Sequence, residues 1–193
     1  MKIALALFLL ITSSVFADDF DTLARDFWNW RAAEQPVSGD DIPRIDRPAN
    51  WMPKWAQSDI AEYKKALSGF EDRWKKIDAS SWPVSKQVDY RLIGSGIARV
   101  RWELEVLRSS ERDPLFYTQQ SLGAVFLYLV QPAPFDESRT SAIVLQMKNI
   151  PQIVEDAKRN LNDARAPFAQ LAIEQLKDVR ASVEKSMAQL KPH

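Results

Sequence analysis

The sequence predicts an all-α fold, and three observations carry this prediction. Apolar residues recur at spacings of three and four along most of the 193-residue chain, as one face of an amphipathic helix requires. Prolines and helix-capping residues divide these stretches into segments of helical length. No stretch alternates between apolar and polar residues for long enough to predict a sheet. We therefore expect an antiparallel helical bundle of about six to seven helices with one long Pro-rich loop.

The first 17 residues have the three-part organisation of a secretory signal peptide. Lys2 supplies a positive charge, residues 3–11 are apolar, and the small residue Ala17 precedes two aspartates. The apolar stretch is too short to span a bilayer, which takes roughly twenty residues. We therefore expect cleavage after Ala17, a periplasmic or secreted location, and no membrane association after cleavage. A buried N-terminal helix is the alternative interpretation.

Three helices are predicted next, over about residues 20–30, 58–77 and 85–109. On the second, apolar residues alternate steps of three and four, which is a heptad-like seam for packing against another helix. These residues are Ile60, Tyr63, Leu67, Phe70, Trp74 and Ile77. Gly94 and Gly96 weaken the third helix locally and allow another helix to approach closely.

Four more helices are predicted in the second half of the chain. Residues 117–130 are apolar on nearly all sides, so we expect this helix to be central and buried. Asp136 caps the next helix, and Pro151 is expected to begin a separate one, since proline suits a first helical turn. The last helix is predicted over 167–190 with an inward-facing apolar side. That side consists of Phe168, Leu171, Leu176, Val179, Val183, Met187 and Leu190.

One long segment, residues 35–57, is predicted to be a loop. It contains four prolines together with Gly39, Asp40 and Asp41. Structureless segments of this length are uncommon in compact domains and are often functional. The chain has no internal repeat and no second composition regime after the signal peptide. We therefore expect one helical domain over residues 18–193 that contains this loop.

Composition excludes several classes of function. The 26 basic residues balance 26 acidic ones, whereas a nucleic-acid-binding protein needs an excess of Lys and Arg. The chain has no Cys, and its only His is His193 at the last position. A thiolate nucleophile, a Ser–His–Asp triad and a multi-histidine metal site are therefore excluded. We expect no catalytic residue, no metal ion, no cofactor and no nucleic-acid partner.

Tryptophans on and near the long loop are the candidate ligand-binding residues. Trp51 and Trp55 lie on the loop, and Trp28 and Trp30 precede it. Flat rings on a loop stack on sugars or hold a peptide side chain at little cost in conformational entropy. In the alternative interpretation these rings pin the loop onto the helical bundle, because their apolar faces are costly to leave in water.

Clusters of charged residues are weaker candidates. The carboxylates group as Asp40, Asp41 and Asp46, as Glu103 and Glu105, and as Glu155 and Asp156. The loop group lacks the ligand spacing of a calcium loop, and the middle pair points apart on a helix. We expect solvated surface or helix capping for all three groups, and likewise for the mixed charges of the last helices. A further alternative is an enzyme that works through carboxylates alone, as glycosidases do. No pair of carboxylates in the sequence specifically supports it.

Several short motifs follow one another along the chain. They are Phe27-Trp28-Asn29-Trp30-Arg31 with Gly39-Asp40, Asp89-Tyr90-Arg91-Leu92, Arg112-Asp113-Pro114-Leu115-Phe116-Tyr117, Met147-Lys148-Asn149-Ile150-Pro151 and Ala157-Lys158-Arg159-Asn160-Leu161. In order and spacing, they resemble the N-terminal region of the bacterial family named domain of unknown function 885. The resemblance covers most of residues 20–190 and implies a secreted, largely helical protein. It also implies kinship with zinc-peptidase-like proteins whose His-Glu-x-x-Pro-Gly-His-type metal motif lies in a C-terminal half.

That metal motif has no counterpart here, since the chain contains no His-Glu pair, so no catalytic residue of the family is assigned. What the resemblance implies is a helical wall of the kind that lines the family's substrate channel. We expect a secreted helical protein that is not catalytic on its own, either a natural short relative or a truncated gene product. The alternative is a peptide- or glycan-binding module that uses the tryptophans of residues 48–55. A protein or peptide partner, or a second copy, would bind a bare apolar helix face, for which residues 117–130 are the candidate.

Overall fold

The computed structural model describes residues 20–38, 47–130, 132 and 134–190 of the chain. In this part every regular element is helical and no strand occurs, so the prediction of an all-α fold with about six to seven helices is confirmed. The described helices include none that is long and apolar enough to cross a membrane. The signal peptide predicted over residues 1–17 lies outside the described residues.

The chain divides into two compact units. Unit 1 consists of Met1–Gln35, Pro43–Trp51 and Ser58–Val106. Unit 2 consists of Pro36–Ile42, Met52–Gln57 and Leu107–His193. The long loop therefore contributes segments to both units, and the single domain over residues 18–193 stays a prediction.

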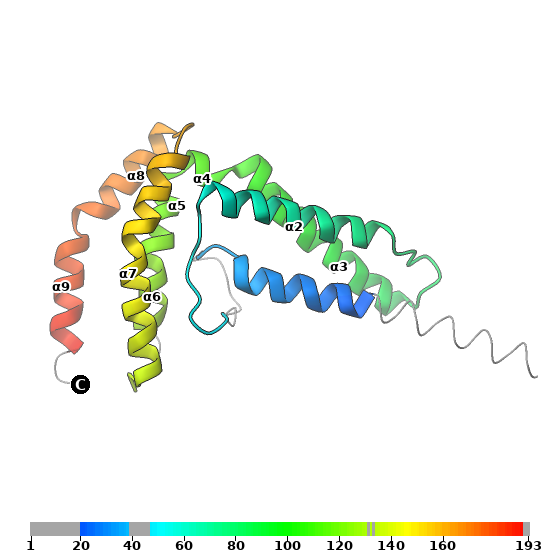
Figure 1. The fold of residues 1–193 in the computed structure, drawn as a ribbon, viewed down its shortest axis with the longest axis horizontal. Helices are drawn as coiled ribbons and strands as arrows, with labels where there is room; N and C mark the ends of the chain where they lie inside the picture. Colours follow the sequence, from blue (N-terminus) through cyan, green and yellow to red (C-terminus); the bar gives the residue numbers. More distant parts are fainter. Residues whose placement is uncertain (1–19, 39–46, 131, 133, 191–193) are drawn as a thin grey trace, which may run out of the picture. The chain divides into compact units, whose positions relative to one another are not determined.

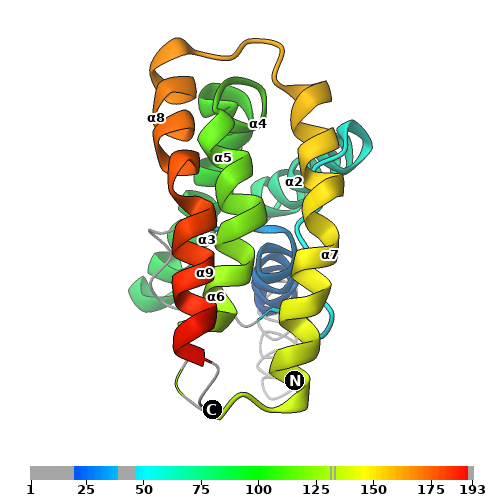
Figure 2. The same ribbon diagram turned by 90° about the vertical axis from the view of Figure 1, so that its left-hand side faces the viewer.

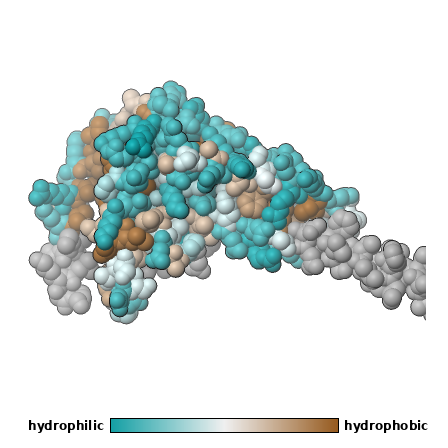
Figure 3. All heavy atoms as spheres, in the orientation of Figure 1, coloured by the Kyte–Doolittle hydropathy of each residue, from teal (hydrophilic) through white to brown (hydrophobic). Residues whose placement is uncertain are grey.

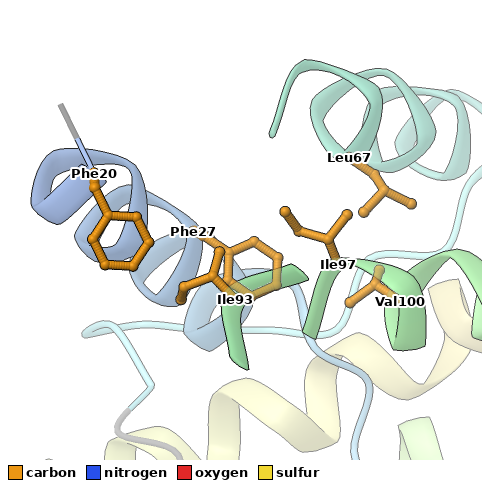
Figure 4. Close-up of a cluster of buried hydrophobic side chains, with 6 residues drawn as sticks. All are labelled: Phe20, Phe27, Leu67, Ile93, Ile97 and Val100. Carbon is orange, nitrogen blue, oxygen red and sulfur yellow. The ribbon is translucent and has the colours of Figure 1, made fainter. Parts of the chain in front are cut away.

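Unit 1 contains long helices packed around an apolar cluster. The first covers residues 20–34 and is followed by α2 (Gln57–Lys75) and α3 (Val84–Arg101), which continues into the π-helical stretch η1 (Trp102–Leu107). α2 runs opposite to both other helices (Figure 1). An apolar cluster lies between them, as Figure 4 shows. It is formed by Phe20, Phe27, Leu67, Ile93, Ile97 and Val100.

The predicted close approach at Gly94 is confirmed. A Cβ atom added there would lie 2.7 Å from Cε2 of Trp74, which is a clash. Trp74 is held in place because its ring stacks on Tyr90, with centroids 4.9 Å apart, and its Nε1 donates to the main-chain oxygen of Tyr90 at 3.0 Å. Glycine is therefore the residue that lets α2 and α3 pack at this point.

Unit 2 is a layered arrangement of helices. Its first helical stretch consists of α4 (Ser109–Arg112), α5 (Pro114–Thr118), the π-helical η2 (Gln119–Gly123) and α6 (Ala124–Leu129). It is followed by α7 (Glu137–Asn160), α8 (Ala166–Lys177) and α9 (Val179–Leu190). α5 packs against both α7 and α8, and α6 packs against α7. Figure 2 accordingly shows the α5–α6 stretch between α7 and α8, with α7 antiparallel to both.

Aspartate caps begin two helices of unit 2. The carboxylate of Asp113 accepts a hydrogen bond from the main-chain N–H of Leu115, and Asp136 accepts one from the N–H of Arg139. The Arg139 guanidinium is buried and donates to main-chain carbonyls at the end of α6, including that of Tyr128 at 2.7 Å. This arginine therefore satisfies carbonyls that the end of α6 leaves without helical partners.

Two helix boundaries differ from the prediction. α7 continues through Pro151, where the sequence predicts a new helix. Pro151 lies on the exposed side of α7, so the loss of one helical hydrogen bond there is offset by the packing of the opposite side. The predicted last helix is instead divided at Asp178 into α8 and α9. Asp178 leaves helical geometry (φ −109°, ψ 6°), in keeping with the low helix propensity of aspartate.

The predicted burial of two helices is wrong. The helix over 117–130 is buried at its start, but Phe126, Leu127 and Val130 are exposed. On the predicted inward side of α8 and α9, Phe168, Leu171, Leu176 and Val183 are exposed, and Ala172 is the buried residue of α8. A helix that is apolar on several sides has more apolar surface than the neighbours in unit 2 cover.

Gly94→Ala is expected to destabilise the protein by about 1–3 kcal/mol, because the new methyl group overlaps the fixed Trp74 ring. Gly69→Ala is the matched control: it lies on α2 with no atom within 4 Å of the added Cβ, so it should stabilise by up to about 1 kcal/mol through helix propensity. Urea unfolding followed by circular dichroism measures both changes. Equal midpoints for the two variants would contradict the packing described here.

Candidate functional site

A cluster of buried polar side chains in unit 2 is the candidate site. The amide Nδ2 of Asn160 donates hydrogen bonds to the main-chain oxygen of Trp55 at 2.6 Å and to the hydroxyl of Tyr117 at 2.9 Å. The Tyr117 hydroxyl donates in turn to the main-chain oxygen of Ser110 at 2.7 Å. These residues come from the long loop, α4, α5 and α7. We call this group of four residues the Asn160 cluster.

The inward side of α7 supplies the amide of this cluster. Its residues follow one another at steps of three and four, as one face of a helix requires. They are Gln146, Asn149, Ile153, Asp156 and Asn160. The side chains of Gln146, Asp156 and Asn160 are each only 2% exposed. The buried side of α7 is therefore mostly polar, which reverses the usual amphipathic arrangement.

Two further amides hold segments of the long loop in unit 2. Asn149 Nδ2 donates to the main-chain oxygen of Pro53 at 2.9 Å. Gln120, which is fully buried on η2, accepts a hydrogen bond from the N–H of Val37 at 2.8 Å and donates to its carbonyl at 2.9 Å. Gln120 thus pairs with both main-chain groups of Val37, as a neighbouring strand would. Side-chain amides take the place of main-chain pairing for these loop segments.

Burial sets the electrostatics of the Asn160 cluster. It raises the pKa of the Tyr117 hydroxyl to about 12; the hydrogen bond from Asn160 opposes this shift, and the negative charge of Asp156 adds to it. Asp156 is itself buried and accepts a hydrogen bond from Gln152 Nε2 at 2.9 Å. Burial also raises the pKa of the Asp113 carboxyl group at the start of α5. At neutral pH, Tyr117 is therefore an uncharged hydrogen-bond donor.

The Asn160 cluster is suited to binding main-chain groups. Its one side-chain amide, that of Asn160, forms hydrogen bonds without changing protonation state, and its tyrosine is neutral. Within the described residues, no three His, Asp or Glu side chains are grouped so as to hold a metal ion. The groups that the cluster and its neighbouring amides hold are the carbonyls of Pro53 and Trp55 and both main-chain groups of Val37.

Of the four predicted tryptophans, Trp28, Trp30 and Trp51 belong to unit 1 and Trp55 belongs to unit 2. Trp51 is buried, and its Nε1 donates to the main-chain oxygen of Ala33 within unit 1. Trp55 is buried in unit 2, edge-on to Phe116 with ring centroids 4.6 Å apart. Trp30 is half-buried, whereas Trp28 is 51% exposed. The two loop tryptophans thus pack as the pinned-loop interpretation expects, and ligand binding by any of the four stays a prediction.

The carboxylates predicted to be surface groups divide into different environments. Glu103 pairs with Arg31 at 2.7 Å, while Glu105 pairs with Arg101, so the two point apart as predicted. Glu155 is exposed and pairs with Lys158. The surface prediction is wrong for Asp156, which faces the interior of unit 2. The loop group Asp40, Asp41 and Asp46 lies outside the described residues.

Sequence reasoning did not single out the amides of Gln120, Asn149 and Asn160 as site residues. Two of them, Asn149 and Asn160, belong to the motifs that carry the family resemblance, and so does Tyr117. A run of polar residues at heptad spacing along α7 is a second signal that could have found them. No protein-family model, curated protein or solved structure matches this chain.

Tyr117→Phe is expected to lower the free energy of unfolding by about 1–3 kcal/mol at pH 7, because Ser110 and Asn160 lose a buried hydrogen-bond partner. It should also change the response to alkali. The pKa of the Tyr117 hydroxyl rises from 10.0 to about 12 on folding, so its neutral form stabilises the fold below pH 10 and this contribution is lost as the pH rises to about 12.

The variant should therefore lose stability less steeply than the wild type between pH 10 and pH 12. Urea unfolding at a series of pH values measures both slopes. Identical slopes would mean that the Tyr117 hydroxyl titrates normally in the folded protein.

Proposed function

We propose that this chain is a secreted, non-catalytic helical protein that acts by binding another protein through apolar side chains on the outside of unit 2. The distribution of side chains in unit 2 carries this proposal. Polar residues such as Gln120, Gln146 and Asn160 are buried in its interior beside apolar ones, while other large apolar residues remain exposed to water. An isolated exposed leucine is ordinary in a soluble protein, but buried polar groups together with many exposed apolar ones are informative.

The exposed apolar residues occur on every long helix of unit 2. They are Phe126, Leu127 and Val130 at the end of the α6 stretch, Val144, Met147 and Val154 on α7, Phe168, Leu171, Ile173 and Leu176 on α8, and Val183 on α9. Figure 3 shows hydrophobic surface over the region of α7 to α9, at the left-hand side of the view. We call these residues the outer apolar set.

Covering this set would release substantial free energy. Leu171, Ile173 and Leu176 on the single helix α8 are 53%, 53% and 50% exposed. Fully burying a side chain of this size stabilises by about 1.5–3 kcal/mol, so covering the exposed half of each contributes on the order of 1 kcal/mol. A partner with a complementary apolar helical surface would bury several of these residues at once, and their contributions to the binding free energy would accumulate.

The family resemblance supports the same proposal. The resemblance is to a zinc-peptidase-like family. Its N-terminal helices form one wall of the substrate channel, and its C-terminal half carries the metal ligands. Residues of these motifs form hydrogen bonds inside unit 2. Asn160 donates to the Tyr117 hydroxyl, and Asn149 donates to the main-chain oxygen of Pro53 on the loop. We propose that the chain resembles that wall in architecture and lacks catalytic activity by itself.

Leu171→Gln combined with Leu176→Gln is expected to weaken partner binding about thirtyfold, because two half-exposed leucines contribute on the order of 2 kcal/mol to an apolar interface. Val84→Gln, at a 77% exposed position in unit 1, is the control and should retain binding. The measurement is affinity capture from the cells that produce the protein, followed by titration of the captured partner. Light scattering distinguishes a second copy from a different protein, and equal capture by both variants would contradict the proposal.

The mature chain incubated with zinc and a broad peptide library is expected to yield no turnover, because its sequence lacks a His-Glu motif and its only histidine is His193. Mass spectrometry of the library before and after incubation detects any cleavage. A parallel incubation with a known zinc peptidase verifies that the library contains cleavable peptides. Zinc-dependent cleavage by the chain would overturn the assignment as non-catalytic.

A further inference from the structure

Residues 52–56 lie across unit 2 as an extended segment, which we call the strap. The strap contains no helix or strand, and α2 begins directly after it. Its side chains alternate in burial: Pro53 and Trp55 are buried, whereas Lys54 between them is exposed. This alternation is typical of an extended peptide that lies on a protein surface and places every second side chain into it.

The strap is held through its main chain. The carbonyl of Pro53 accepts a hydrogen bond from Asn149 at 2.9 Å, and the carbonyl of Trp55 accepts one from Asn160 at 2.6 Å. Both donors are side-chain amides of α7, and the two carbonyls are two residues apart. Every peptide carries such carbonyls, so these contacts do not require the strap's own sequence.

Side-chain contacts add a preference for an aromatic residue. The Trp55 indole meets the Phe116 ring edge to face, with centroids 4.6 Å apart and an interplanar angle of 83°. This geometry is favourable between aromatic rings beyond the area it buries. Together with the buried Pro53, it fits a ligand with a proline followed two residues later by tryptophan. We call Phe116, Tyr117, Asn149 and Asn160 the strap-binding surface.

The donor at the centre of this surface is oriented without the strap. Asn160 Nδ2 uses its second hydrogen to bond the Tyr117 hydroxyl, and that hydroxyl donates to the Ser110 carbonyl. Neither partner belongs to the strap. If the strap leaves, the bond to Tyr117 still orients the Asn160 amide, so its remaining N–H is directed to donate to the carbonyl of another peptide at the same place.

One polar atom of the site is left unused by the strap. The side-chain oxygen of Asn160 is buried and has no hydrogen-bond partner among the described residues. An occupant that brings an N–H or hydroxyl group to this oxygen would satisfy it, and the strap does not. The strap is thus an incomplete match to the surface that holds it.

We propose that the strap-binding surface is a receptor for extended peptides of another protein that contain proline followed two residues later by tryptophan, and that the strap is its tethered competitor. A tethered segment acts at a high effective concentration, in the millimolar range for short flexible links, so the strap masks the receptor in the intact chain. A peptide binds when the strap is weakened or displaced. This site is separate from the outer apolar set, so either proposal can fail without the other.

The test uses a fluorescein-labelled peptide with the sequence of residues 52–57, capped at both ends, and the full chain with Trp55→Ala. This substitution removes the tethered indole and leaves every residue of the strap-binding surface in place. Fluorescence anisotropy is expected to show saturable one-to-one binding at least tenfold tighter than binding to the wild type. The same peptide with its tryptophan replaced by alanine should lose at least tenfold in affinity.

Asn149→Ala, combined with Trp55→Ala, should weaken peptide binding by about twofold to tenfold, because one hydrogen bond to the peptide is lost. If Trp55→Ala does not give the wild-type helical circular dichroism spectrum, Trp55→Phe replaces it, since the smaller ring weakens the strap while retaining an aromatic group. No saturable binding to either folded variant would overturn the proposal. Equal binding of the peptides with and without tryptophan would overturn it as well.

Discussion

The amide of Asn160 is the constraint on which the rest of unit 2 depends. A buried amide that lacks an acceptor costs about 1–3 kcal/mol, so both of its hydrogens need partners. One goes to Tyr117 and the other to the carbonyl of Trp55. The acceptor comes from residues 52–56, which contain no helix or strand. Pro53, which lacks an N–H, helps to keep the segment extended.

Most of the helices could be predicted because their signals are local. The seam of α2, the caps at Asp113 and Asp136, and the prolines of the long loop each act within a few residues. The prediction of a new helix at Pro151 is wrong, because the stabilisation from packing α7 outweighs the loss of one helical hydrogen bond. Local rules describe where a helix is favourable to begin, and tertiary contacts decide whether it ends.

The candidate site could not be predicted in the same way. Periodicity assigns apolar residues to the inside of a helix, whereas α7 buries Gln146, Asp156 and Asn160. The hydrogen-bond partners of Asn160, for example, lie 43 and 105 residues away in the sequence. No local sequence pattern encodes contacts at such a separation. The tryptophans were visible in the sequence because they are large and rare, but their burial depends on the same distant contacts. The function of the polar residues along α7 can be inferred only once the segment to which they hydrogen-bond is known.

The two units of this protein bury different kinds of side chain, and this difference has a consequence for what each can do. Unit 1 is stabilised by an apolar cluster around Phe27 and Leu67, which is strong but carries little directional information. Unit 2 places amides inside, and each net hydrogen bond stabilises less than a buried leucine, yet it fixes which main-chain group lies at which point. Apolar residues such as Leu171 are at the same time exposed on the outside of unit 2. The buried amides therefore account for the precision with which unit 2 holds an extended segment, and the exposed apolar residues give it a second surface suited to a protein partner.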